Sequence, residues 1–372
     1  MKNKDNLLTE KEIYYLCVSS IIGIGFFKLS HDIVKVVGQD GWLPNILGII
    51  YPCYIAAISI YIMKKFPNDD IISIGKKYFG NIFGTVLGVL YIMEFFVLIP
   101  SIAAGFTNVL RVYAVTFLPR INIIIGIILV AWYCSLSGIK NIARMSKLII
   151  VIFLLPIFIS MGALKSGSIL NLQPVLQSNI KKIIQGILLT TFQYSGIEFL
   201  LLIHPHFKSK DIVQRPIFKA IFTLMIIYTW IVFISIYYLG PELVPKSSWP
   251  FTLVTESIVV PVINNFRFVF VSLWSIVIIK TVSNYYYYVS VGLAYNFNIE
   301  NKTVAIVLFP MLIISSLFYK NEIVRRYIGN VIINSTVLFN VLYLTLIFVI
   351  TYVKERENTK LKNTKQIQDK RT

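Results

Sequence analysis

Charged residues are scarce in this sequence. Asp, Glu, Lys and Arg make up 14% of its 372 residues, against roughly 25% in a typical soluble domain. A soluble domain with so little charge could not cover its surface with polar groups. Apolar residues make up 56% of the chain, so the composition excludes an ordinary soluble protein and indicates an all-α polytopic membrane protein.

Cysteine and histidine are scarce as well, with three of each. Cys17, Cys53 and Cys134 lie in separate apolar segments without metal or disulfide spacing, so we interpret them as small core residues. The sequence contains no HExxH, GxSxG, GxGxxG or Walker motif. It therefore supports neither an enzyme nor an ATP-driven pump, and we expect no cofactor and no metal site.

Acidic residues are few compared with basic ones: 17 Asp and Glu stand against 35 Lys and Arg, a formal net charge of +18. In a soluble protein this excess would suggest nucleic acid. In a membrane protein, Lys and Arg gather in loops and tails that remain cytoplasmic, beside anionic lipid. We therefore expect no nucleic-acid partner and place both termini in the cytoplasm. The basic clusters on that side are residues 2–11, 64–77, 140–147, 208–219 and 354–371. Two pairs, Lys181/Lys182 and Arg325/Arg326, fall on the opposite side.

Apolar runs of about 20 residues, the length that crosses a bilayer, recur along the chain. The ten predicted spans are residues 13–36, 42–63, 82–110, 121–138, 147–164, 183–204, 217–239, 267–293, 303–319 and 331–353. We expect residues 13–353 to form one transmembrane domain after a short cytoplasmic N-terminus at 1–12. The basic tail at 354–372 has no apolar periodicity and is predicted to be disordered.

Four ionisable residues lie near the middle of predicted spans, where each costs roughly 2.5–3.5 kcal/mol to insert. They are Lys28, Glu94, Glu198 and Lys280, on the first, third, sixth and eighth spans. Two acids and two bases make a neutral set, which a low-dielectric interior tolerates if the groups pair. We expect Lys28 to pair with Glu198 and Glu94 with Lys280. The alternatives are that some of them face a polar crevice and have only a structural packing role, or that Lys28 extends to the outer interface.

Two of these spans place small, flexible residues just before the charge: SSIIGIGFFKLS at 19–30 and QYSGIEFLL at 193–201. Glycine costs roughly 1 kcal/mol in a helix interior, so both stretches favour an unwound turn. Unwound backbone inside a membrane requires a polar cavity, and broken helices at corresponding places in two halves are typical of a transporter-type site. The freed N–H groups would favour a ligand carboxylate, and the freed carbonyls an ammonium group or cation.

The order of these features resembles the spore germination permeases, the B-subunits of germinant receptors. The marks are GIG in the first span, YPCYIAAISIYIMKKFPNDDI and YFGNIFG between Tyr51 and Gly84, YSGIE in the sixth span, and WPFTLVTESI and FRFVFVSLW between Trp249 and Trp274. The similarity covers residues 9–353. It implies the LeuT-like fold of the amino acid–polyamine–organocation superfamily. That fold is a 5+5 inverted repeat of ten helices, in which helices 1 and 6 are unwound and helices 1, 3, 6 and 8 line a midplane site.

The resemblance also implies which residues form the site. The ligand-binding residues it implies are Gly23, Ile24, Gly25, Tyr194, Ser195, Gly196 and Glu198. Lys28, Glu94, Glu198 and Lys280 would set the charge of the cavity and its coupling to conformational change. The chain departs from the family pattern at FFKLS, where Lys28 adds a positive charge that many relatives lack and Ser30 stands in place of a proline.

Several functions fit this pattern. The resemblance implies a germinant receptor subunit in the inner membrane of the spore, which binds a small germinant such as an amino acid and works with an A-subunit and a C-subunit lipoprotein. A proton- or cation-coupled amino acid transporter has the same fold, with Glu198 or Glu94 as the proton carrier; it would accumulate ligand against a gradient. A channel for ions or water would conduct without stoichiometric substrate movement. A scaffold for the other subunits gives no reason to bury four charges.

Overall fold

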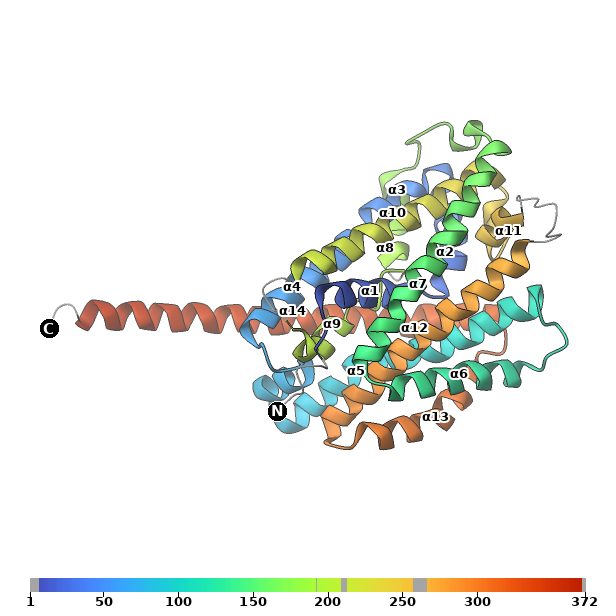
Figure 1. The fold of residues 1–372 in the computed structure, drawn as a ribbon. Coiled ribbons are helices and arrows are strands. Elements are labelled where there is room, and N and C mark those ends of the chain that lie inside the picture. The colour runs from blue at the N-terminus through green and yellow to red at the C-terminus, as the bar shows by residue number, and fades with distance from the viewer. Residues whose placement is uncertain (1–6, 192, 209–212, 257–265, 370–372) are drawn as a thin grey trace.

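The computed structural model describes residues 7–191, 193–208, 213–256 and 266–369, and it is built from α-helices (Figure 1). The first half of the chain contains α1 (Glu10–Ile21), α2 (Gly25–Val37), α3 (Trp42–Leu47), α4 (Ile50–Lys65), α5 (Ile71–Tyr113), α6 (Arg120–Leu136) and α7 (Ile139–Ser160). The second half contains α8 (Ile180–Thr191), α9 (Phe199–Ile203), α10 (Gln214–Leu239), α11 (Pro250–Glu256), α12 (Phe266–Phe297), α13 (Asn301–Phe318) and α14 (Glu322–Asp369). The all-α class predicted from composition is confirmed.

Most of the predicted spans correspond to single long helices. Seven helical segments of the described chain are long and apolar enough to cross a membrane, and an eighth is counted when the bent pair α1–α2 is taken as one span. Two predicted spans do not reach that length as single helices. Residues 121–138 form α6, an apolar helix of 17 residues, and residues 183–204 form α8 and α9 on either side of an interruption. The chain is a multi-pass membrane protein in which the first and sixth spans are broken.

The first break separates α1 from α2, whose axes differ in direction by 58°. Helix α1 ends at Ile21, and α2 begins at Gly25. A β-carbon added to Gly25 would lie only 2.0 Å from Oε1 of Gln193 in the sixth span. The two broken spans therefore contact each other at their breaks.

The second break depends on Gly196, whose φ of 106° lies in the region that side-chain-bearing residues avoid. A β-carbon at this position would lie 2.4 Å from the hydroxyl of Tyr285 and 2.9 Å from the carbonyl oxygen of Ser20. Both neighbours belong to other spans, since Ser20 is near the end of α1 and Tyr285 is in α12. Glycine is thus required here by both backbone conformation and packing.

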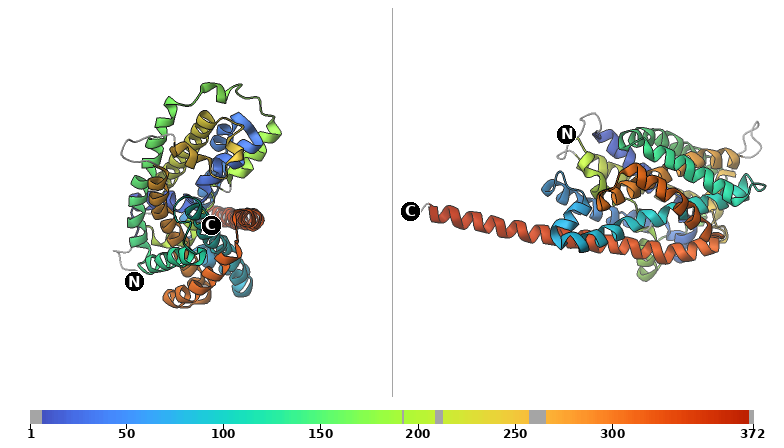
Figure 2. Two further views of the ribbon diagram at one scale, coloured as in Figure 1. Left: turned by 90° about the vertical axis from the view of Figure 1, so that its right-hand side faces the viewer. Right: turned by 90° about the horizontal axis from the view of Figure 1, so that it is seen from below.

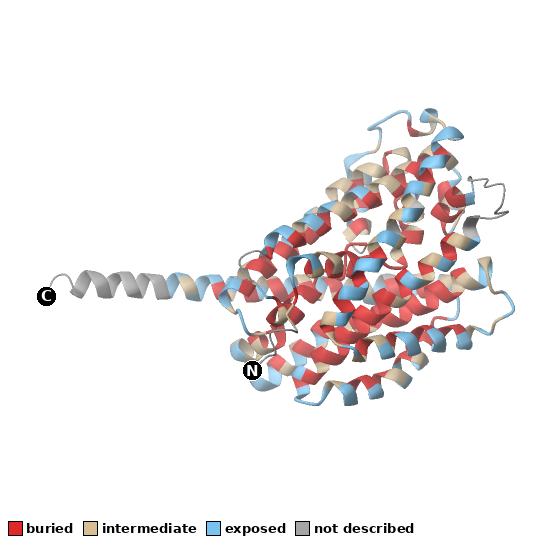
Figure 3. Cartoon of the chain, in the orientation of Figure 1, coloured by how far each residue is buried: buried red, intermediate tan, exposed pale blue. Residues whose placement is uncertain are grey.

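Aromatic packing holds α2, the second half of the first span, in place. The ring centroid of Phe26 lies 4.1 Å from that of Trp274 and 5.0 Å from that of Phe251, and Phe27 lies 5.3 Å from Trp274. All four side chains are buried, and Figure 3 shows that buried residues concentrate on the helix faces inside the bundle. Helix α2 is thereby fixed against α11 and α12.

The N-terminal end of the first broken span and the C-terminal end of the sixth are joined by backbone hydrogen bonds. The amide of Leu8, just before α1, donates to the carbonyl of His206 over 2.8 Å, and the amide of Lys208 donates to the carbonyl of Leu8 over 3.0 Å. His206 and Lys208 directly follow α9. A displacement of the N-terminal end of α1 would therefore act on the C-terminal end of α9.

The C-terminal tail differs from its prediction. Helix α14 runs without interruption to Asp369 and projects away from the bundle (Figures 1 and 2), whereas residues 354–372 were predicted to be disordered; residues 370–372 lie outside the described chain. A helix that continues from an anchored segment needs no new nucleus, and Lys, Glu and Gln in the tail have high helix propensity. The absence of apolar periodicity therefore did not imply the absence of helix.

Candidate functional site

A small pocket of about 70 Å³ lies where the two broken spans meet. Its lining comes from the first break and α2, from the sixth break, and from α5, α12 and α14. The lining residues are Ile21, Gly23, Ile24, Gly25, Lys28, Leu98, Ser101, Ile102, Gln193, Ser195, Tyr285, Arg325, Arg326, Gly329, Ile333 and Asn334. Ligand pockets for drug-sized molecules measure roughly 300–1,000 Å³, so this pocket suits only a small ligand.

The carbonyl groups freed by the first break are already hydrogen-bonded. The hydroxyl of Tyr285 donates to the carbonyl of Ser20 over 2.5 Å, and the hydroxyl of Thr281 donates to that of Ile22 over 2.5 Å. Both donors lie on α12. Helix α12 therefore satisfies the acceptors of the unwound turn, which stabilises the break in a low-dielectric interior.

The backbone N–H groups at the breaks, in contrast to the carbonyls, have no acceptor among the described residues. The backbone N–H groups of Gly23, Ile24, Gly25 and Ser195 have no hydrogen-bond partner among the described residues, and all four residues line the pocket. These N–H groups include the start of α2, where a helix carries partial positive charge. The breaks thus present hydrogen-bond donors to the pocket while their acceptors are occupied.

Two other predicted site residues of the sixth span do not reach the pocket. Tyr194 is buried, and its hydroxyl donates to the carbonyl of Asn45 over 3.3 Å. Gly196 shapes the turn, and its amide donates to Oε2 of Glu198 over 2.7 Å. The pocket lining from this span is instead Gln193 and Ser195.

Glu198 lies beneath the sixth break and not in the pocket. Its carboxylate accepts hydrogen bonds from the amide of Gly196 and from the hydroxyl of Tyr51, while Tyr91 donates to its backbone carbonyl. The side chain is fully buried. Glu198 thus holds the unwound turn in shape and ties it to α4 and α5.

Glu94, on α5, is also fully buried. The amide of Asn340, on α14, donates to its Oε2 and to the carbonyl of Tyr91 over 3.3 Å. Oε1 of Glu94 has no hydrogen-bond partner among the described residues. Glu94 does not line the pocket, and it links α5 to α14.

Lys280 connects α12 to the end of α1. Its amine donates to Oδ1 of Asn284, and Nδ2 of Asn284 donates to the hydroxyls of Ser19 and Ser20 over 3.0 and 3.1 Å. Only 4% of Lys280 is exposed. This hydrogen-bond network reaches the residues just before the first break without entering the pocket.

The expected charge pairs were wrong. Lys28 forms an ion pair with Asp32, one helical turn further along α2, over 3.3 Å, and not with Glu198. Lys280 is hydrogen-bonded to Asn284, and Glu94 to Asn340. The physical reason is position: Lys28 follows the first break and lines the pocket, whereas Glu198 follows the sixth break and is held away from the pocket by Gly196 and Tyr51. Of the four charges, Lys28 alone lines the pocket.

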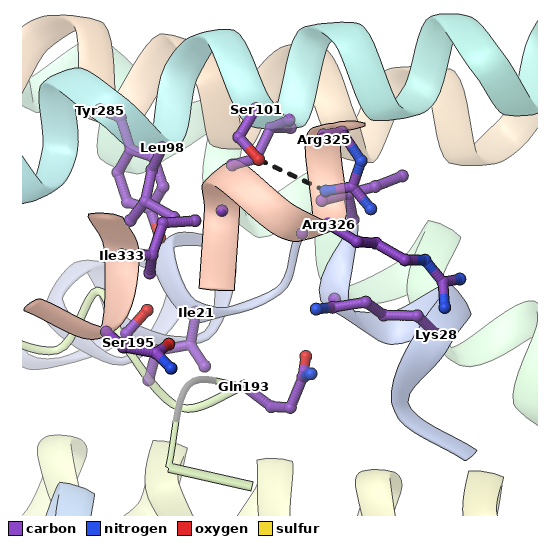
Figure 4. A pocket seen from close by; sticks show the side chains of 16 residues that line it. Ile21, Lys28, Leu98, Ser101, Gln193, Ser195, Tyr285, Arg325, Arg326 and Ile333 are labelled. Carbon is purple, nitrogen blue, oxygen red and sulfur yellow. Dashed lines mark hydrogen bonds between the residues drawn. The ribbon is translucent and has the colours of Figure 1, made fainter. Parts of the chain in front are cut away.

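Two arginines at the start of α14 were missed as site residues. Arg325 and Arg326 line the pocket, and both donate to Glu322, Arg325 over 2.5 Å and Arg326 over 2.9 Å. Arg325 is 4% exposed and also donates to the hydroxyl of Ser101 over 3.3 Å (Figure 4). Their sequence signal was an exception to the charge rule, because this basic pair falls on the side where few Lys and Arg are expected.

Comparisons with known proteins identify the family. Residues 7–325 match the family described as "Spore germination protein". The chain belongs to this family. It is 25% identical over 313 residues to spore germination protein GerQB of Bacillus cereus, covering 83% of this chain and 86% of that one. It is 22% identical over 298 residues to spore germination protein A2 of Bacillus subtilis, covering 79% and 81% of the two chains.

The fold also matches a solved transporter structure. A Na⁺-coupled sialic acid symporter, in a substrate-bound outward-open state, superposes with a TM-score of 0.62 at 11% identity, covering 92% of this chain and 78% of that one. This likeness confirms the LeuT-like architecture predicted from the resemblance. The family and the fold are those of permease-like membrane proteins.

Proposed function

We propose that this protein is the ligand-recognising membrane subunit of a spore germinant receptor, and that a small germinant such as an amino acid binds in the pocket between the broken spans. The supporting observation is that backbone groups of both breaks, at Gly23–Gly25 and at Ser195, line one pocket. A ligand that contacts both breaks favours one arrangement of the two spans over another. Such a difference in affinity between states is what a receptor needs in order to signal.

The germinant would bind from the outer side of the spore inner membrane, and the receptor would include an A-subunit and a C-subunit lipoprotein. The inner ends of α1 and α9, joined through Leu8 and His206, are the parts that would transmit a change at the breaks to the cytoplasmic face. In this proposal residues 13–353 form the membrane domain and residues 354–372 a basic cytoplasmic extension.

The test fills the pocket without altering either break. Gly329 lines the pocket from α14, and a β-carbon there would meet only Ile333 and Ser101, at 3.6 and 3.9 Å. Gly329→Leu adds four carbon atoms in that space. Gly126→Leu is the matched control, because Gly126 is exposed on α6 with no atom within 4 Å of its β-carbon position.

Spores carrying each variant would be tested over a panel of amino acids, with subunit abundance measured by immunoblot. We expect Gly329→Leu to abolish the response or to raise the germinant concentration required at least tenfold, and Gly126→Leu to respond normally. A normal response of Gly329→Leu spores at normal abundance would contradict the proposed site.

Coupled transport remains a second candidate because of the two buried carboxylates. Among the described residues neither Glu94 nor Glu198 forms an ion pair, although both lie beside the sixth break. Buried carboxylates without a basic partner are typical of proton-carrying groups in membranes. Accumulation of a labelled germinant in proteoliposomes against its gradient, dependent on a proton gradient, would favour this function over recognition alone.

A further inference from the structure

The charge of the pocket points to a specific class of ligand. Three basic side chains line it, Lys28, Arg325 and Arg326, and no Asp or Glu is among its described lining residues. Figure 4 shows these basic side chains together on one side of the pocket, with the Lys28 amine directed inward. A neutral pocket for a zwitterionic amino acid would need acceptors for the ammonium group as well as donors for the carboxylate.

Nearby acids do not neutralise this charge completely. Asp32 lies 3.3 Å from the amine of Lys28 and 3.7 Å from the guanidinium of Arg326. Glu322 contacts both arginines. Two carboxylates thus pair with three cations, and both carboxylates lie outside the pocket lining. The cluster keeps one formal positive charge in excess on the pocket side, where partial burial limits screening by solvent.

The hydrogen-bonding groups of the pocket also favour a negatively charged ligand. The amides of Gly23–Gly25 and Ser195, which have no acceptor within the described part of the chain, are donors, whereas the carbonyls of Ser20 and Ile22 already accept from α12. Gln193 adds a buried group without a partner. It is 7% exposed, lines the pocket from the sixth break, and its amide forms no hydrogen bond with the described residues. Figure 4 shows it extending toward the basic side chains.

We propose that the pocket selects a small carboxylate of net negative charge, such as an acidic amino acid or a dicarboxylate, over a neutral amino acid. One carboxylate would be held by the amides of the breaks and Gln193, and the second negative charge by Lys28 and the α14 arginines. Charge-assisted hydrogen bonds of this kind are about twice as strong as neutral ones. This inference rests on the proposed function and specifies its ligand.

The experiment measures binding to the purified full-length chain in lipid nanodiscs at constant ionic strength. L-aspartate and L-asparagine are the main probes, because they have nearly the same shape and differ by one charge. Succinate tests whether the ammonium group is needed, and inorganic phosphate tests for unspecific anion binding. We expect aspartate and succinate to bind at least tenfold more tightly than asparagine.

Three variants test the origin of that preference. Lys28→Gln should bring the aspartate-to-asparagine ratio close to one, and Lys28→Arg should retain it because the charge is kept. Lys165→Gln is the matched control, since Lys165 is exposed in the loop after α7 and lies outside the pocket. This control should leave the ratio unchanged.

Equal binding of asparagine and aspartate, or an unchanged ratio in Lys28→Gln, would overturn the charge preference. Binding of phosphate alone would overturn the carboxylate assignment, and so would an absence of binding by every probe. In each of these cases the germination response of Gly329→Leu spores separately decides whether the pocket is the receptor site.

Discussion

Replacing Gly196 by alanine should destabilise the protein by about 2–6 kcal/mol. The φ of 106° places the residue in a region that costs an L-residue roughly 1–3 kcal/mol. The added methyl group would also lie 2.4 Å from the Tyr285 hydroxyl and 2.9 Å from the Ser20 carbonyl oxygen, and overpacking of a core typically costs about 1–3 kcal/mol. The Ser20 contact is the more severe constraint, because a backbone atom cannot rotate away.

The assay is thermal unfolding of the purified chain in nanodiscs, together with its abundance in spores. Gly126→Ala serves as control. It places a methyl group in open space on α6 and should be neutral or stabilising by up to roughly 1 kcal/mol, as alanine is the better helix former.

A double variant, Gly196→Ala with Tyr285→Phe, separates steric from conformational cost. Removal of the Tyr285 hydroxyl relieves one clash, so the two substitutions should be less destabilising together than the sum of the single effects, by about 0.5–3 kcal/mol. If the Gly196→Ala variant were as stable as the wild type, the reasoning would be refuted, because the sixth break could then adopt a conformation that accepts a β-carbon.

Two further predictions concern the groups around the breaks. Glu198→Gln keeps the size of the side chain but removes its charge, so spores should lose or shift their germinant response at normal subunit abundance on immunoblot; a normal response would leave Glu198 with a packing role only. Asn284→Ala removes the link from Lys280 to Ser19 and Ser20 and should cost about 1–3 kcal/mol in thermal unfolding, because it leaves buried polar groups unpaired. Unchanged stability of Asn284→Ala would mean that this network does not hold α1 against α12.

The breaks were predictable because they depend on local chemistry. Glycine weakens a helix wherever it occurs, so Gly23, Gly25 and Gly196 marked the unwound turns before any contact was known. Which residues of those turns face the ligand pocket depends on the direction of each side chain after the chain unwinds. Tyr194 and Glu198 were predicted site residues but point to α3 and α4, whereas Gln193, which was not among the predicted site residues, lines the pocket.

The basic residues that line the pocket show a second limit of prediction from sequence. Arg325 and Arg326 lie some 300 residues after Lys28 in the sequence, and the resemblance directed attention to helices 1, 3, 6 and 8. Their unusual position on the predicted outer side was visible in the sequence. It could not be connected to Lys28 without knowing that the start of α14 packs over the first break.

The sequence by itself determined the membrane class, the spans, the two broken helices and the family, because hydropathy, glycine placement and motif order are properties of contiguous residues. The tertiary structure alone decided the partners of the buried charges and the composition of the pocket. The physical reason is that electrostatic and hydrogen-bond pairing act over a few ångströms in space. Glu198 is therefore hydrogen-bonded to Tyr51 of α4, where the sequence had suggested Lys28 as its partner, and Lys28 shares one pocket with Arg325 and Arg326 from the far end of the chain.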